Sequence, residues 1–322
     1  MEEKIHKRRV HYSGTHPKRF EEKYKEHDPE KYADTLQIQP GQQGLDATLG
    51  YGGHTRRMLE QLHGEGHMYA LDVDPIEIVK TKHRLSEAGY GEDILTIKQT
   101  NFRNIDQVAE EAGGFDFILA DLGVSSMQID NPDRGFTYKF DGPLDLRLDP
   151  EKGESAAERL REVSYEELVG MFQENSDEPY AEEIATVIMK RNRTKNYVET
   201  TTQMKDAIEE ALAFVPEKDR KEAVKKSCQR CFQALRIDVN SEFEVLYDFL
   251  DKLPDALRPG GKVAILTFHS GEDRLVKRAF KAGAKAGVYS EVSKDVIRPS
   301  AEECARNPRA RSTKMRWAVK AE

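Results

Sequence analysis

The stretch 45–54, with the sequence LDATLGYGGH, constrains the fold of this chain more than any other. A short apolar segment runs into a turn that contains Gly50, Gly52 and Gly53, and a helical pattern follows. Glycine permits positive φ angles and lets a ligand approach the backbone, and the first N–H groups of a helix have no partner within it. A second strand-like segment, 67–72, ends in a carboxylate about twenty residues later, where such folds hold a ribose diol. We therefore expect a cofactor site at this turn.

Short apolar segments alternate with amphipathic ones between residues 44 and 121, which is the pattern of a βαβ series. We predict strands at 44–49, 67–72, 94–98 and 116–121, and helices at 54–63, 75–89 and 104–112. The series resumes later with a helix near 239–253, a turn at 258–261 and strands at 262–267 and 314–320. Connections of this kind predict a parallel sheet, so the strand-end carboxylates Asp46, Asp72 and Asp121 should meet at one edge.

The segment 154–232 differs in composition, with many Glu, Lys and Arg residues, helical spacing of apolar residues and no good strand. Before it, 121–150 is rich in Gly, Pro and Asp and too long for an ordinary connection, which favours a functional loop. We expect an α/β fold, a Rossmann-like sheet with an inserted all-helical subdomain. The expected parts are a basic N-terminal segment 1–43, a discontinuous sheet domain of 44–130 and 233–322, and an inserted loop and helical domain 131–232.

The net charge of −8 argues against a protein that coats nucleic acid non-specifically. The segment 298–320 nevertheless carries seven Lys or Arg against two Glu, and residues 1–25 carry eight against four, which is compatible with a localised phosphate-binding surface. No apolar run approaches membrane-spanning length and the start of the chain is charged, so we expect a soluble cytoplasmic protein without a membrane partner. The three cysteines, Cys228, Cys231 and Cys304, are expected to be reduced and non-catalytic, without a metal.

The chain contains neither a GxxxxGK[ST] phosphate loop nor a GxSxG nucleophile elbow, and its histidines lack metal-ligand spacing. An acid-rich site without a phosphate loop suits a cofactor with a ribose and a cationic or amino-acid tail. S-adenosylmethionine is such a molecule. A dinucleotide remains an alternative, because the glycine turn and Asp72 also permit an NAD-dependent dehydrogenase.

Six motifs, in order along residues 44 to about 316, resemble those of the MraW-type (RsmH) family of S-adenosylmethionine-dependent methyltransferases. The motifs are DATLGYGGH at 46–54, DLGVSSMQID at 121–130, RGF at 134–136 with DGPLDLRLD at 141–149, FQALRI at 232–237, FHS at 268–270 and NPRARS at 307–312. Members of this family methylate the exocyclic N4 of a cytidine in the decoding region of small-subunit ribosomal RNA. The resemblance implies that the α/β fold is a Rossmann-like class I methyltransferase sheet with an inserted all-helical subdomain. It also implies that ribosomal RNA or the small ribosomal subunit is the partner; it implies no oligomeric state.

The resemblance also assigns residues to the cofactor. Those implied to bind it are Gly52, Gly53, His54, Asp72, Phe102, Asp121 and Gln128. The positions of the strand ends independently indicate Gly52, Gly53, Asp72 and Asp121; they do not indicate Phe102 or Gln128.

Cytosine N4 is a poor nucleophile because its lone pair is delocalised into the ring, so an enzyme must orient it and accept its hydrogen bonds. We expect Asp121, Ser125 and Ser126 to grip the target amine, and His269, after the strand at 262–267, to line the base pocket. A paired base hides N4, so the cytidine should be unstacked. The phosphate-contact candidates are Arg134, Arg147, Arg309 and Arg311. A paralogue acting on another RNA site and a non-catalytic RNA-binding or ribosome-assembly protein remain alternatives.

Overall fold

The computed structural model describes residues 35–322, which fall into two compact units. The sheet unit comprises 35–123 and 243–322, and the helical unit comprises 124–242. Most of the basic N-terminal segment 1–43 therefore lies outside the described residues. No helix within 35–322 is both long and apolar enough to cross a membrane.

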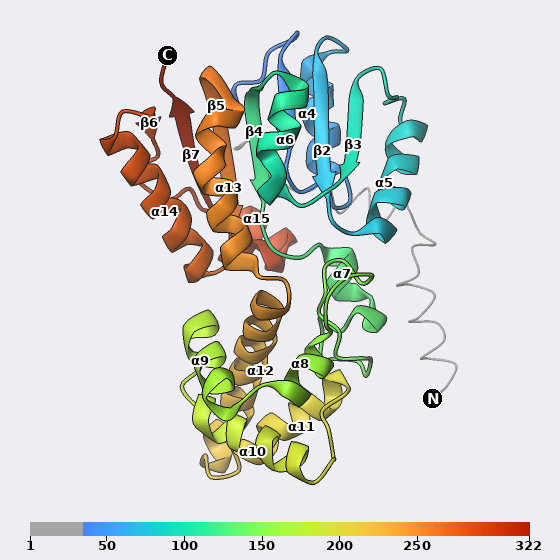
Figure 1. Ribbon diagram of the computed structural model, residues 1–322, viewed down its shortest axis with the longest axis vertical. Helices are drawn as coiled ribbons and strands as arrows, with labels where there is room; N and C mark the ends of the chain where they lie inside the picture. Colours follow the sequence, from blue (N-terminus) through green and yellow to red (C-terminus); the bar gives the residue numbers. More distant parts are fainter. Residues whose placement is uncertain (1–34) are drawn as a thin grey trace. The chain divides into compact units, whose positions relative to one another are not determined.

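The sheet unit contains seven strands in the order β3-β2-β1-β4-β5-β7-β6 (Figure 1). They are β1 Gln43–Asp46, β2 His67–Asp72, β3 Leu95–Gln99, β4 Phe115–Asp121, β5 Leu257–Thr267, β6 Tyr289–Val292 and β7 Lys314–Lys320. The strands β1 to β5 pair in parallel, whereas β7 pairs antiparallel with both β5 and β6. Because β2 and β4 flank β1 and the strand order reverses there, the carboxyl ends of β1 and β4 form the switch point where parallel sheets bind ligands.

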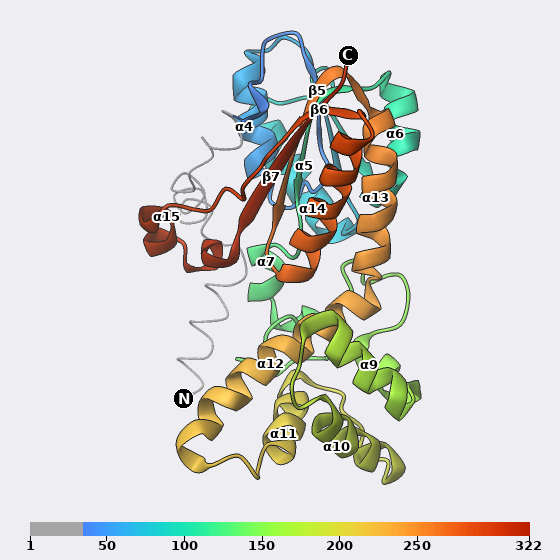
Figure 2. The same cartoon turned by 90° about the vertical axis from the view of Figure 1, so that its left-hand side faces the viewer.

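Helices cover both faces of this sheet (Figure 2). They are α4 Gly53–Leu62, α5 Pro75–Glu87, α6 Ile105–Ala112, α13 Glu242–Ala256 and α14 Ser270–Lys285. The sheet unit also contains α15 Ala301–Arg306, which has no buried residue, and the 3-10 turns η1 Phe102–Asn104 and η3 Pro308–Ser312. Neighbouring residues of β5 alternate between the two cores: Val263 and Ile265 pack with α6, α13 and α14, and Ala264 packs on the side of α4 and α5. This alternation is the expected geometry of a strand buried on both faces.

Three details of the sheet differ from the sequence-based prediction. β1 ends at Asp46 instead of residue 49, because the carboxylate of Asp46 accepts the N–H of Thr48 and the backbone turns there. The predicted turn at 258–261 lies inside β5 as a bulge, between the pairs Phe115–Leu257 and Phe117–Lys262. The strand β6 and the helix α14 were not predicted.

The helical unit contains no strand among its described residues, which confirms the all-helical insertion. Its elements are α7 Ser126–Asp130, η2 Pro132–Arg134, α8 Ala156–Glu162, α9 Tyr165–Ser176, α10 Ala181–Arg193, α11 Thr201–Ala211 and α12 Glu217–Val239. α8, α9 and α11 each begin with a capping box, in which a Ser or Thr hydroxyl and the Glu or Gln three residues later satisfy each other's backbone N–H groups.

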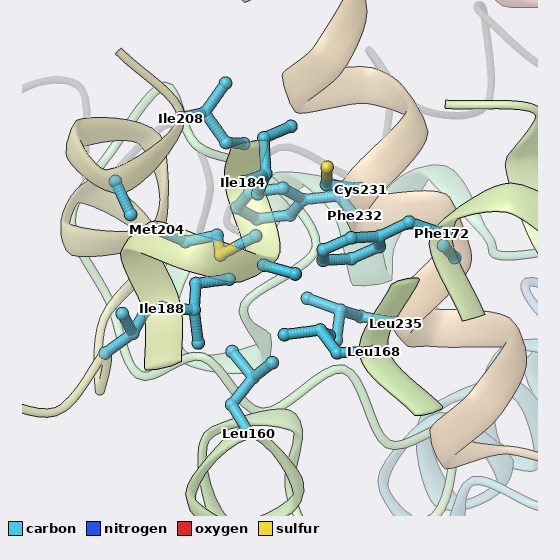
Figure 3. Close-up of a cluster of buried hydrophobic side chains, with 14 of the residues drawn as sticks. Leu160, Leu168, Phe172, Ile184, Ile188, Met204, Ile208, Cys231, Phe232 and Leu235 are labelled. Carbon is cyan, nitrogen blue, oxygen red and sulfur yellow. The ribbon is translucent and has the colours of Figure 1, made fainter. Parts of the chain in front are cut away.

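The core of the helical unit is formed by apolar residues from five helices (Figure 3). Phe172 of α9 is fully buried there. Cys228 and Cys231 of α12 are also fully buried, and burial raises the pKa of the Cys228 thiol to about 12. Both thiols therefore act as small apolar groups in this core, not as nucleophiles.

Candidate active site

Three carboxylates end the central strands of the sheet, as the sequence predicted: Asp46 ends β1, Asp72 ends β2 and Asp121 ends β4. Asp46 is completely buried, and its carboxylate accepts the hydroxyl of Thr55 at 2.6 Å and the N–H of Thr48 at 3.0 Å. Burial raises the pKa of Asp46, an effect that the nearby His54 and these hydrogen bonds only partly oppose. Asp46 therefore joins the start of the glycine turn, at Thr48, to the helix that follows it, at Thr55.

Asp121 is held in a different way. Its N–H donates to the Thr48 hydroxyl at 2.7 Å, and its Oδ2 lies 3.1 Å from His54 Nε2. Burial lowers the pKa of His54, but the hydrogen bond to Asp121 and the charges of Asp121 and Asp46 outweigh it and raise the pKa overall. The other carboxylate oxygen, Oδ1, is buried and has no hydrogen-bond partner among the described residues. A buried acceptor without a partner is costly, which is characteristic of an atom that receives a ligand.

The glycine turn is fixed by Asp72 and by α5. The N–H of Gly50 donates to Asp72 Oδ2 at 2.8 Å, and the carbonyl of Gly50 accepts the Thr81 hydroxyl at 2.6 Å. The guanidinium of Arg84 stacks 3.8 Å from the ring centre of Tyr51 and donates to the Tyr51 carbonyl. The turn is therefore held in one conformation before any ligand arrives, which lowers the entropy cost of binding.

Gly52 begins α4 with a φ of 84°, in the left-handed region, and no side chain caps the helix there. A Cβ at this position would lie 2.7 Å from Thr81 Cγ2. The first turn of α4 also contains no acidic residue. Its N–H groups and the positive end of its dipole therefore suit an anionic group such as a carboxylate.

We expect Gly52→Ala to lower the free energy of unfolding by about 2–3 kcal/mol, because it adds a clash to the strain of positive φ. Gly64→Ala is the matched control, since Gly64 has a φ of 79° and a Cβ at that position would meet nothing within 4 Å; it should lose only about 1 kcal/mol. Urea denaturation of both variants measures the difference. Equal losses would show that Thr81 does not confine the turn.

Two other predicted residues have neighbours within the sheet unit. Phe102, in η1, packs edge to face on Phe249 with ring centres 5.1 Å apart, so part of its ring belongs to the core. His269 precedes α14, and its Nε2 lies 3.2 Å from the buried carboxylate of Glu272, which also accepts the N–H of Phe268. The side chain of His269 is 10% exposed. These contacts give both side chains a structural role besides any ligand role.

Gln128, Ser125 and Ser126 belong to the helical unit. The Ser125 hydroxyl accepts the N–H of Gln128, and Gln128 Oε1 accepts the N–H of Ser125, so the pair caps α7. The structure therefore assigns Ser125 and Gln128 a local capping function.

One of the predicted phosphate contacts, Arg134, is wrong, and a second, Arg147, is paired within its own loop. Arg134 is buried and donates to the carbonyls of Arg147 and Leu148, and Arg147 makes a bidentate pair with Asp145. Their guanidinium groups hold their own chain together, because a buried arginine needs partners for its donors. Arg309 and Arg311, in η3, are exposed.

Sequence reasoning missed the threonines that organise the site. Thr48 supports Asp121, Thr55 supports Asp46, and Thr81 closes the turn over Gly50. The signal for Thr48 was its position two residues after a strand-end aspartate, a spacing at which the carboxylate accepts a backbone N–H. No local signal marks Thr81, which lies 31 residues from its partner.

Several known proteins are similar to this chain over almost its whole length. The ribosomal RNA small subunit methyltransferase H 1 of Agathobacter rectalis is 66% identical to it, over 100% of this chain and 99% of the relative. The ribosomal RNA small subunit methyltransferase H 2 of Alkaliphilus metalliredigens is 56% identical over 99% of each chain, and the methyltransferase H of Thioalkalivibrio sulfidiphilus is 36% identical over 90% and 94%. The model of the MraW methylase family matches residues 29–321. These matches confirm what the six sequence motifs indicated: the chain belongs to the MraW methylase family.

Proposed function

We propose that this methyltransferase transfers a methyl group from S-adenosylmethionine to N4 of a cytidine in small-subunit ribosomal RNA. The methyltransferase activity follows from the family, and the class of RNA is that in the names of its relatives. The observation that carries the chemical part is the carboxylate of Asp121, which is fixed through one oxygen while the other is buried and has no partner within residues 35–322.

The residues at the carboxyl ends of the strands fit this methyl donor. The carboxylate of Asp72 follows β2, where it can accept the ribose hydroxyls, and α4 offers uncapped N–H groups to the carboxylate of the methionine part. The cationic sulfonium is favoured near Asp121 and Asp46. When bound, the donor supplies an electrophilic methyl group.

Asp121 makes the amino group of cytosine reactive. Its Oδ1 accepts a hydrogen bond from N4–H, which holds the amine in line and stabilises the positive charge that develops on nitrogen. His54 and Thr48 act as positioning residues, because they fix the other oxygen and the backbone of Asp121. The new N4–C bond would form as the C–S bond of the donor breaks, which would leave S-adenosylhomocysteine, and the surplus proton of N4 would pass to Asp121 Oδ1.

The remaining assignments stay proposals of the same kind. Gly53 contributes a backbone N–H group to the donor, Phe102 lies beside the adenine with the part of its ring that the core leaves exposed, and His269 lines the base pocket. The assignments of Gln128 to the cofactor and of Ser126 to the amine stay predictions from the family resemblance.

Nucleoside analysis of methylated RNA tests the proposed function. Purified protein is incubated with methyl-labelled S-adenosylmethionine and small ribosomal subunits, and the RNA is digested to nucleosides. The label should appear in N4-methylcytidine. Label in a C5-methyl or ribose-methyl nucleoside, or none at all, would contradict the proposal.

We expect binding of the methyl donor to depend on the ionisation of Asp72, whose pKa is raised to about 6 chiefly by burial. A raised carboxyl pKa means that the folded protein binds a proton more tightly than the unfolded chain, so this group stabilises the fold below pH 4 and loses that contribution as the pH rises through about 6. Ribose hydroxyls prefer the carboxylate, so donor affinity should fall by up to about tenfold per pH unit below 6.

Calorimetric titration with S-adenosylhomocysteine between pH 5 and pH 8 measures this effect. The Asp72→Asn variant should bind more weakly, without the step near pH 6. A parent protein whose affinity is unchanged over this range would exclude contact between Asp72 and the ribose.

A further inference from the structure

The helix α14 has an unusual outer face. Five cations, Arg274, Lys277, Arg278, Lys281 and Lys285, are all exposed. At 3.6 residues per turn they lie within an arc of about 100°. Val276 and Phe280, which are buried against the sheet, lie on the opposite side of the helix. The five residues, here called the α14 basic face, therefore form one stripe.

Nothing on the described chain neutralises this stripe. None of the five cations forms an ion pair within the described residues, and the sequence contains no Asp or Glu between residues 274 and 290. Of the acids at the start of α14, Glu272 is buried beside His269, and Asp273 accepts hydrogen bonds from Arg316 and lies 3.7 Å from Lys314 Nζ. The charge of Lys277 contributes to the lowered pKa of Asp273 without pairing with it.

An ordinary solvent-exposed helix places opposite charges four residues apart, as α4 does with Arg56 and Glu60. In α14 the pairs 274–278, 277–281 and 281–285 join like charges, which destabilises the helix. In a chain with a net charge of −8, the stripe is a localised positive patch, which attracts an anionic partner.

The position of α14 indicates which anionic partner binds the α14 basic face. β5 runs parallel to β4, so its carboxyl end lies at the edge where Asp121 ends β4, and α14 begins three residues after Thr267. α14 then returns along the sheet beside β6 and β7 (Figures 1 and 2). From Arg274 to Lys285 the stripe is about 16 Å long, enough for several phosphates of a nucleic-acid strand.

We propose that the α14 basic face binds the phosphate backbone of the substrate RNA and leads the strand toward the carboxyl edge of the sheet. This inference rests on the proposed function for the identity of the RNA. It assigns the contact to α14, whereas the sequence-based candidates were Arg134 and Arg147 in the inserted loop and Arg309 and Arg311 near the C-terminus.

Fluorescence anisotropy with a labelled RNA hairpin tests the proposal, on the full-length protein and over a range of salt concentrations. The test variant is Arg278→Gln with Lys281→Gln and Lys285→Gln. The control, Lys80→Gln with Lys82→Gln and Lys98→Gln, also removes three cations from the sheet unit. These lysines lie on α5 and β3, at the other edge of the sheet, and each forms an ion pair with a glutamate. Circular dichroism verifies that both variants are folded.

The slope of log affinity against log salt should become shallower by about 2 in the test variant, because each phosphate contact of a single strand contributes about 0.7. Between 50 and 200 mM salt, the parent should therefore lose roughly twenty-fold more affinity than the test variant. The control should behave like the parent. An unchanged slope in the test variant, or an equal change in the control, would overturn the proposal.

Two further measurements separate this inference from its alternatives. Affinity for S-adenosylhomocysteine should be the same in the test variant and the parent. Binding of the parent to anionic lipid vesicles, lost in the test variant while RNA binding is retained, would identify a membrane surface as the occupant and overturn the inference. If the test variant binds RNA normally while the parent methylates cytidine N4, the inference fails and the proposed function stands. If the test variant binds RNA more weakly but the parent does not methylate cytidine N4, the inference stands and the proposed function fails.

Discussion

Replacing Asp121 by asparagine should reduce kcat for methyl transfer about 100- to 1000-fold, with little change in stability. Asparagine has nearly the same size and keeps a hydrogen bond with His54, but it removes the negative charge that stabilises the developing cation on N4. Removal of one preorganised electrostatic group from an active site has effects of this size. The turnover of labelled S-adenosylmethionine with saturating small subunits measures the change.

Asp106→Asn is the matched control for this prediction. Asp106 is a carboxylate of the same unit whose side chain is 49% exposed and which pairs with Lys252 on the surface. Its replacement should leave kcat within twofold of the parent, as expected for a surface ion pair. An Asp121→Asn enzyme with the activity of this control would remove Asp121 from the chemistry.

Phe172→Ala should lower the free energy of unfolding of the helical unit by about 3–5 kcal/mol, the usual cost of removing a fully buried aromatic ring. The ring is completely buried in the cluster drawn in Figure 3, between residues of α9, α10 and α12. Urea denaturation followed by far-ultraviolet circular dichroism measures the loss, because this unit is built from helices.

Phe214→Ala serves as its control. Phe214 is 63% exposed and touches the ring of Tyr180 edge to face, so its loss should cost less than about 1 kcal/mol. If both substitutions lowered the stability equally, the helical unit would not have the packed core described for it.

The sheet and the ends of its strands could be predicted from the sequence because both follow from local patterns. Apolar runs mark β1, β2 and β4, and Asp72 and Asp121 stand where the runs of β2 and β4 stop, whereas the run of β1 continues past Asp46 to residue 49. A parallel register then brings them to one edge regardless of the loops between them. For the same reason the helical insertion was recognisable from its spacing.

Contacts between distant residues could not be predicted in this way. Nothing near Arg134 shows that its guanidinium would be buried against carbonyls 13 and 14 residues away, so it was taken for a surface cation. β6 is only four residues long, with two of them exposed, and lacks the alternation that reveals a strand. Its pairing with β7 is a tertiary effect.

The α14 basic face shows a related gap. The sequence contains these cations at helical spacing, but it does not show that they are exposed together. That follows only from the structure, in which Val276 and Phe280 define the side of α14 that faces the sheet. The sequence-based prediction placed the phosphate-binding surface among the cations near the C-terminus. Two of those cations, Lys314 and Arg316, form ion pairs with Asp273.

A crystal structure of the protein bound to S-adenosylhomocysteine tests the central claim most directly. We expect the ribose hydroxyls within hydrogen-bond distance of Asp72, the methionine carboxylate at the start of α4, and the sulfur on the side of Asp121. A ligand that lay away from the carboxyl ends of β1, β2 and β4, or that left Asp72 without contact, would contradict this claim.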